Sequence, residues 1–156
     1  MPHEFPRSTA KIAGHPIHPM LVPVPIVCFA GTLLTDLAYA ATVQPQWANI
    51  SSWLLTIGLL VSVLVVIAGL IDFLGEPRIR ALPHAWIHGA GNGLALLLSL
   101  WNVFVHTHDG YTSVVPTGLT LSALVVLILL VTGWNGWAMV YRHGVGVRPR
   151  EGEDVR

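Results

Sequence analysis

Residues 51–74 read SSWLLTIGLLVSVLVVIAGLIDFL, an apolar run whose only charged side chain is Asp72. A helix needs about 20 apolar residues to cross the hydrocarbon core of a bilayer, which is about 30 Å thick. This run is long enough and apolar enough to do so. We therefore expect it to form a transmembrane helix.

Three more apolar stretches of similar length lie at residues 20–43, 84–105 and 117–141. The joints between the four stretches are polar or contain proline and glycine, at residues 44–46, 75–78 and 106–110. The third stretch is the least apolar, because its opening holds two histidines, three glycines and Asn92. We expect residues 1–147 to form one domain, an all-α, integral membrane four-helix bundle, and residues 148–156 to form a polar cytoplasmic tail.

The overall composition agrees with a membrane protein. The chain is 53% hydrophobic and 10% charged, and its mean hydropathy is +0.65. A soluble domain carries about 25% charged residues, so this chain has too few charges to solvate a globule. The formal net charge is zero, which gives no basic surface for nucleic acid. The single cysteine, Cys28, has no partner for an internal disulfide.

The basic side chains set the expected orientation. Arg7 and Lys11 precede the first stretch, and Arg78 and Arg80 lie between the second and third. The remaining four follow the fourth stretch: Arg142, Arg148, Arg150 and Arg156. All eight therefore fall on one side of the membrane, and the positive-inside rule makes that side cytoplasmic. We expect an N-in/C-in topology.

Two histidine pairs open the first and third stretches. His15 and His18 both precede a proline, so we expect an extended or turn conformation there. His84 and His88 are four residues apart and share one face of a helix. The expected topology brings all four imidazoles to the cytoplasmic side, where ionisable groups at membrane depth are costly and usually functional.

One interpretation of these pairs is a b-type haem site. Imidazoles from two helices of a bundle can bind one iron from opposite sides, and we expect His18 and His88 as the ligands, with His15 and His84 as alternates. Three arginines at the same face would pair with the haem propionates: Arg78, Arg80 and Arg142. Such a protein would pass electrons between a membrane quinol and a redox protein.

A non-haem metal site is the second interpretation, because zinc and iron both accept nitrogen and oxygen ligands. Its candidate ligands are the side chains that the topology brings to the cytoplasmic face: His15, His18, His84, His88, Asp72 and His143.

Three polar side chains lie inside the expected spans: Asp36, Asn92 and Asn102. Asp36 stands towards the outer end of the first span, with Asn102 at similar depth as its expected partner. We favour interhelical hydrogen bonds for all three, and the alternative is a proton or ion path. A small transporter of this kind, or an accessory membrane subunit, is the third functional class. Four helices enclose little volume, so transport would require a homo-oligomer. We expect His106 and His108 in the outer loop.

Several motifs are shared with a known family. The chain opens with Gly14-His15-Pro16-Ile17-His18-Pro19 and continues with Asp36-Leu37 and Ala68-Gly69-Leu70-Ile71-Asp72. It closes with Gly133-Trp134-Asn135-Gly136 and with YRHGVGV at residues 141–147. From about residue 12 to residue 147 the chain resembles the bacterial predicted-membrane-protein family called domain of unknown function 2231.

The resemblance implies a location in the bacterial cytoplasmic (inner) membrane. Some relatives are fused to Rieske-type iron–sulfur domains, which implies electron transfer, but one cysteine cannot hold such a cluster in this chain. The sequence contains no Ser-His-Asp or phosphate-cradling glycine motif, so hydrolytic and phosphoryl-transfer activities are not indicated. The lipid bilayer is the one partner on which all three functional classes agree.

Overall fold

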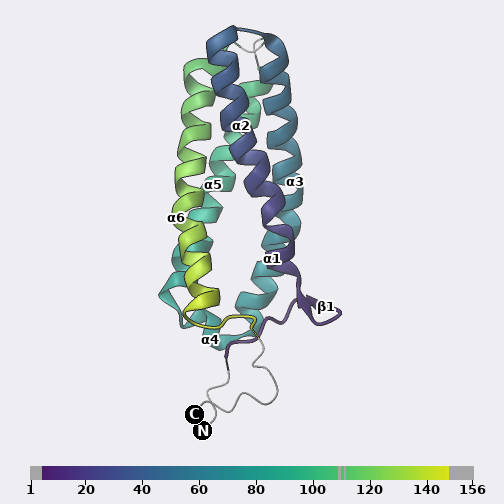
Figure 1. Ribbon diagram of the computed structural model, residues 1–156, viewed down its shortest axis with the longest axis vertical. Coiled ribbons are helices and arrows are strands. Elements are labelled where there is room, and N and C mark those ends of the chain that lie inside the picture. Colours follow the sequence, from purple (N-terminus) through teal and green to yellow (C-terminus); the bar gives the residue numbers. More distant parts are fainter. Residues whose placement is uncertain (1–4, 109, 111, 148–156) are drawn as a thin grey trace.

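The computed structural model describes residues 5–108, 110 and 112–147. Its framework is four long helices that run side by side (Figure 1): α2 (Pro23–Thr42), α3 (Pro45–Gly75), α5 (Pro83–Thr107) and α6 (Leu119–Tyr141). The shorter elements are α1 (Ile17–Leu21), α4 (Pro77–Arg80), the π-helical turn η2 (Val114–Gly118), and the two-residue strands β1 (Lys11–Ile12) and β2 (His15–Pro16). The predicted all-α class is confirmed.

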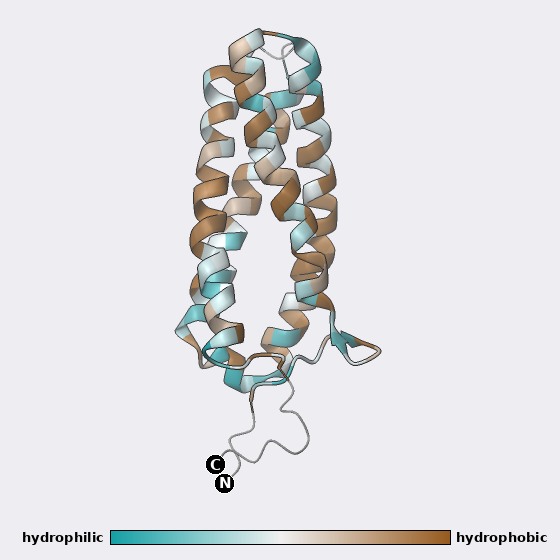
Figure 2. Cartoon of the chain, viewed as in Figure 1, coloured by the Kyte–Doolittle hydropathy of each residue, from teal (hydrophilic) through white to brown (hydrophobic). Residues whose placement is uncertain are grey.

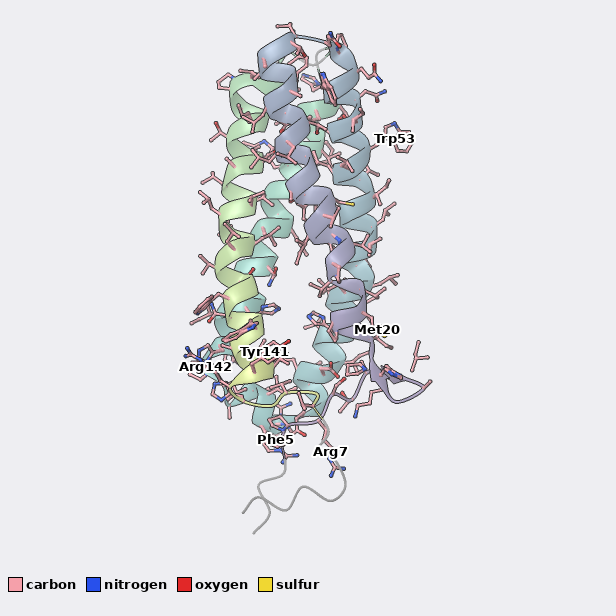
Figure 3. All side chains as sticks on the ribbon, in the orientation of Figure 1. Phe5, Arg7, Met20, Trp53, Tyr141 and Arg142 are labelled. Carbon is pink, nitrogen blue, oxygen red and sulfur yellow. The ribbon has the colours of Figure 1, made fainter. Side chains whose placement is uncertain are left out.

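The helices pack as two antiparallel pairs. The chief contacts of α2 are with α3 and those of α5 are with α6, while α3–α5 and α2–α6 contacts join the two pairs. Strands β1 and β2 form a small antiparallel hairpin before α1, in which Ile12 pairs with His15. The first and last described segments lie at the same end of the bundle, since the Gly146 amide donates to the Pro6 carbonyl at 2.9 Å. Figure 3 shows Phe5, Tyr141 and Arg142 at this terminal end.

Three segments are long and apolar enough to cross a membrane: Ile17–Thr42, Pro45–Gly75 and Val114–Tyr141. Large apolar side chains cover the outside of the bundle, for example Leu60, Leu97 and Leu130, each about two-thirds exposed. Figure 2 shows apolar residues over the middle of the bundle and polar residues gathered towards its ends. An apolar exterior of this extent suits lipid rather than water.

Helix α5 is not among these three segments, although it is 25 residues long. Its inward face explains the difference, because polar side chains recur along it at intervals of three and four residues, which is the spacing of one helical face. The residues of this face are His84, His88, Asn92, Ala95, Ser99, Asn102 and His106. A fourth span and the N-in/C-in orientation therefore stay predictions.

The interior of the bundle has three levels. Each long helix contributes one side chain to an apolar middle layer made of Phe29, Leu55, Ala95 and Val125. Because the helices alternate in direction, Asp36 and His106 lie beyond this layer at the end away from the termini. His18 and His88 lie on its other side, towards the terminal end. The apolar layer thus separates two polar regions.

Two of the differences from the predicted helix boundaries concern α3 and α5. Helix α3 begins at Pro45, six residues before the predicted start, with the proline in its first turn, where a missing N–H costs nothing. Helix α5 continues to Thr107, so the prediction that His106 lies in the outer loop is wrong. His106 is fully buried, and its imidazole contacts the buried carboxylate of Asp36. The polar residues around His106 in the sequence suggested a loop because they do not show this distant partner. The predicted tail at 148–156 lies outside the described residues.

Candidate functional site

His18 and His88 approach each other inside the bundle near its terminal end. Their ring centroids are 6.0 Å apart and the ring planes meet at 70°. His18 belongs to the short helix α1, and His88 lies on the inward face of α5. The structure thus brings together the two histidines that the sequence analysis selected as ligands.

Each of these imidazoles is held by a main-chain carbonyl. His18 Nδ1 lies 3.0 Å from the Val65 oxygen, and His88 Nδ1 lies 2.8 Å from the Thr132 oxygen. A carbonyl oxygen only accepts hydrogen bonds, so Nδ1 is the donor in both rings, and in the neutral imidazole Nε2 then has the lone pair. This is the tautomer that binds a metal through Nε2 while Nδ1–H donates to a second group.

Each of the two rings packs against a glycine of a neighbouring helix, where a side chain would leave too little space. A Cβ atom at Gly69 would lie 3.0 Å from His18 Nδ1, and one at Gly136 would lie 3.1 Å from His88 Cε1. Each glycine stands four residues after the carbonyl that anchors the ring, one helical turn along α3 or α6. The two halves of the bundle therefore repeat the same arrangement of histidine, carbonyl and glycine.

The other histidines are arranged differently from the sequence pairs. His15 is exposed in the β1–β2 hairpin, where its Nδ1 atom lies 3.1 Å from the Ala13 oxygen. His84 pairs with His143, which follows α6, and their ring centroids are 5.2 Å apart. Histidines from separate helices thus come together, as His18 with His88 and His84 with His143.

The arginines of this end contact groups of the chain itself. Arg78 binds Glu76 through two nitrogens, with Nε 2.9 Å from Oε1 and the second contact at 3.0 Å. This hydrogen bonding from Arg78 lowers the pKa of Glu76 to about 2. Arg80 donates to the carbonyls of Phe73 and Leu74, which lie in the last turn of α3. The predicted contacts of Arg78, Arg80 and Arg142 with propionates stay predictions.

Asp72 anchors the start of the described chain. Its Oδ1 atom accepts from the Thr9 amide at 2.6 Å and the Ala10 amide at 2.7 Å, and the Ser8 hydroxyl donates to it at 3.0 Å. Within the described ranges, no three or more His, Cys, Asp or Glu side chains are grouped so that they could hold a metal ion. The proposed role of Asp72 as a metal ligand accordingly receives no support from its surroundings.

Residues 5–10 form a segment that we call the N-terminal strap. One part of it contacts the turn after α6, through the Pro6 carbonyl and through the Phe5 ring, which packs against Gly144. The other part contacts the end of α3 through Asp72, and the Arg7 amide lies 3.3 Å from Glu76 Oε2. The strap therefore links α6 to α3 at the end of the bundle where His18 and His88 lie.

A buried network that was not predicted from the sequence lies at the opposite end of the bundle. Asp36 Oδ1 lies 2.7 Å from His106 Nε2 and 2.6 Å from the Ser51 hydroxyl, while Oδ2 accepts from Ser122 at 2.6 Å. The predicted direct partner, Asn102, instead donates to Ser122 at 2.8 Å. One carboxylate thus receives donors from α3, α5 and α6. The spacing of His106 from Asn102 on one helical face was the sequence signal for this network.

Asn92 joins α5 to α6 near His88. Its Nδ2 donates to the His88 carbonyl at 2.7 Å, and its Oδ1 accepts from Thr132 at 3.3 Å. This is the interhelical role expected from the sequence. It also supports the histidine site, because Thr132 provides the carbonyl that anchors His88.

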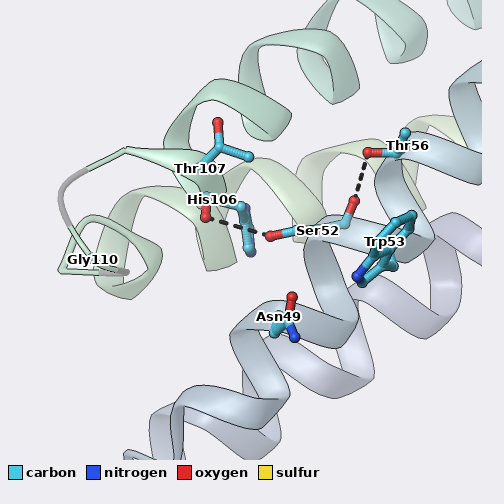
Figure 4. A pocket seen from close by; sticks show the side chains of 7 residues that line it. All are labelled: Asn49, Ser52, Trp53, Thr56, His106, Thr107 and Gly110. Atoms are coloured by element: carbon cyan, nitrogen blue, oxygen red, sulfur yellow. Dashed lines mark hydrogen bonds between the residues drawn. The ribbon is translucent and has the colours of Figure 1, made fainter.

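A pocket of about 540 Å³ opens near the buried network (Figure 4). The Ser52 hydroxyl donates to the His106 carbonyl at 3.4 Å, and Thr56 donates to the Ser52 carbonyl at 2.8 Å. The lining residues are Asn49, Ser52, Trp53, Thr56, His106, Thr107 and Gly110. Because His106 is fully buried, a ligand in this pocket would not contact its imidazole.

Fold and site together define an all-helical membrane protein with paired histidines inside its bundle. The chain belongs to the family described as predicted membrane protein (DUF2231), which it matches over residues 14–149. The predicted family membership is therefore confirmed, and the matched range contains both histidine pairs. No curated protein and no solved structure gives a match to the chain.

Proposed function

We propose that this chain is a b-type haem protein of the bacterial inner membrane and that His18 and His88 are the axial ligands. The observation that carries the proposal is the approach of the two rings from separate helices, each with Nδ1 bound to a carbonyl. Both Nε2 lone pairs are then available for iron.

The separation of the rings fits one metal ion between them. Bonds from a metal to imidazole nitrogen are about 2 Å long, so two nitrogens on opposite sides of one ion are about 4 Å apart. Each ring centroid lies behind its nitrogen, so centroids separated by 6.0 Å suit this arrangement. A direct hydrogen bond between the rings is not available, because each Nδ1 proton is already donated to a carbonyl.

The surroundings of the pair suit redox chemistry. A haem bound there would supply a one-electron redox couple. Gly69 and Gly136 let the two rings pack against α3 and α6, and the apolar layer of Phe29, Leu55, Ala95 and Val125 limits access of water from the far end. We infer that the partners are a membrane quinol and a redox protein.

The proposed topology has four spans and both termini in the cytoplasm. It rests on the eight basic residues, all of which lie on one side in the expected order of spans. His18 and His88 then lie in the cytoplasmic half of the bilayer. Reporter fusions at the two termini and in the segments after Thr42 and Thr107 test this orientation.

An absorption spectrum of the purified protein, expressed with added haem precursor, tests the proposed function. We expect a Soret band and the reduced α-band of a b-type haem, together with an electron paramagnetic resonance signal for two axial imidazoles. His18→Ala and His88→Ala should each abolish the low-spin signal. His15→Ala is the matched control and should leave it unchanged, because His15 is exposed in the hairpin.

Two outcomes would contradict the haem assignment. Stoichiometric zinc or iron without a Soret band would point to the non-haem site. A folded protein with neither metal nor haem would leave the transporter or accessory-subunit class, which flux measurements in proteoliposomes then test.

A further inference from the structure

We propose that His84 and His143 form a second site at the terminal end of the bundle, and that it binds an anionic oxygen of a carboxylate or phosphate group. One source of that oxygen is a haem propionate, and this version rests on the function proposed above. The other source is the phosphate of a phospholipid headgroup. The site is distinct from the His18–His88 pair and does not require it.

The first observation is an imidazole nitrogen that lacks a partner. His84 Nδ1 is buried, and among the described residues it has no hydrogen-bond partner. Its neighbour is another imidazole, that of His143, with ring centroids 5.2 Å apart and planes inclined at 49°. A buried polar atom without a partner is unfavourable, so this position is suited to a ligand that the chain itself does not provide.

The second observation concerns charge. Asp72 already accepts hydrogen bonds from the N-terminal strap, and Glu76 is bound to Arg78. Positive charge at this end comes from Arg142, which precedes His143 in the sequence, and from the amino end of the 25-residue helix α5, whose second residue is His84. The amino end of a helix carries partial positive charge and favours anions. The imidazole pair therefore lies where an anion is favoured.

The third observation favours the cofactor as the source of the anion. His84 stands four residues before His88 on the same face of α5, which corresponds to about 6 Å along the helix axis. A haem held by His88 would carry its propionates at one edge, and the polar terminal end of the bundle is the side on which carboxylates are favoured. His84 and His143 lie at that end and would be the residues that hold the carboxylates.

The shared anion chemistry is tested first in apoprotein. Histidine side chains are labelled with 15N, and sodium propionate and inorganic phosphate are titrated separately. We expect saturable shifts of the His84 and His143 signals, with the His143 shift lost in His84→Phe and the His84 shift lost in His143→Phe. The His106 signals should not change, since His106 is buried at the far end. If neither anion shifts the His84 and His143 signals, the proposal is overturned.

A comparison of haem with haem dimethyl ester then identifies the source. If the propionates occupy the site, the wild-type protein binds haem about tenfold or more tightly than the uncharged ester, and both phenylalanine variants lose this preference. His15→Phe should keep it. Equal affinities overturn the cofactor version, and shifts in nanodiscs of phosphatidylglycerol but not of zwitterionic phosphatidylcholine then assign the site to the phosphate of an anionic phospholipid.

The two proposals fail in different ways. His88→Ala abolishes haem binding if the proposed function is correct, yet it should leave the propionate shifts of His84 in apoprotein intact. A protein that never binds haem but shows those shifts would contradict the haem proposal alone. Haem binding without any preference over the ester, and without anion-induced shifts, would contradict the anion site alone.

Discussion

The Nε2 atom of His106 lies 2.7 Å from Oδ1 of Asp36, and both side chains are completely buried. The pair connects α2 to α5, and the hydroxyls of Ser51 and Ser122 connect the same carboxylate to α3 and α6. A buried carboxylate is tolerated only when such donors surround it. Asp36 is therefore the point at which all four long helices are tied together.

Removing the carboxylate should destabilise the bundle strongly. Asp36→Ala leaves His106, Ser51 and Ser122 without their acceptor, and breaking a buried pair of this kind costs about 3–5 kcal/mol. The free energy of unfolding, measured by circular dichroism in mixed micelles, should fall by that amount. The double variant Asp36→Ala/His106→Ala should lose much less unfolding free energy than the sum of the losses in the two single variants. If the losses of the two single variants add up to the loss of the double variant, the contact between Asp36 and His106 is contradicted.

The closeness of Gly136 to His88 gives a second prediction. A Cβ atom at Gly136 would lie 3.1 Å from His88 Cε1, whereas one at Gly133, three residues earlier on α6, would meet nothing within 4 Å. Gly136→Ala should displace the imidazole and weaken haem binding about tenfold or more, since overpacking typically costs about 1–3 kcal/mol. Gly133→Ala should leave haem binding unchanged. Equal haem affinities in the two variants would show that Gly136 does not position His88.

The sequence predicted the features that depend on local pattern. The apolar runs indicated the long helices, and the proline after His15 indicated the extended segment there. The same prediction was wrong for His18, which lies in the short helix α1. The meeting of His18 with His88 also followed, because the expected order of spans brings both to one end. These inferences need only the residue types and their order along the chain.

Contacts between distant residues were not accessible in the same way. Asp36 and His106 are 70 positions apart, so the four-residue spacing of His106 from Asn102 could indicate a shared helical face but could not identify Asp36 as the partner. Similarly, the four-residue spacing of His84 and His88 suggested one pair, whereas helix packing places His84 beside His143. Partners across helices depend on helix rotation, which a single sequence leaves undetermined.

The third prediction concerns the N-terminal strap. Asp72→Ala removes the acceptor of the Thr9 and Ala10 amides and of the Ser8 hydroxyl. Those amides should then exchange with deuterium about tenfold or more faster, because hydrogen bonds to a charged group contribute about 1.5–3 kcal/mol. Amides of the apolar layer, such as that of Leu55, provide the internal control and should keep their protection. Unchanged exchange at Thr9 and Ala10 would mean that Asp72 does not hold the strap.

The fourth prediction is a loss of stability in acid that depends on Glu76. Hydrogen bonding from Arg78 lowers the pKa of Glu76 from the ordinary value of 4.5 to about 2. The pKa of Glu76 is thus lower in the folded protein than in the unfolded chain, so the ionised carboxylate stabilises the fold. This contribution to the free energy of unfolding is fully present above pH 4.5 and is lost as the pH falls towards 2. The difference in unfolding free energy between wild type and Glu76→Gln should therefore be constant at neutral pH and shrink below pH 4.5.

Glu76→Gln cannot lose a proton, so it provides the baseline. Arg78→Gln should abolish most of the acid-dependent difference because it removes the main donor. A wild-type protein whose stability, relative to Glu76→Gln, does not change between pH 5 and pH 2 would contradict this role for the pair.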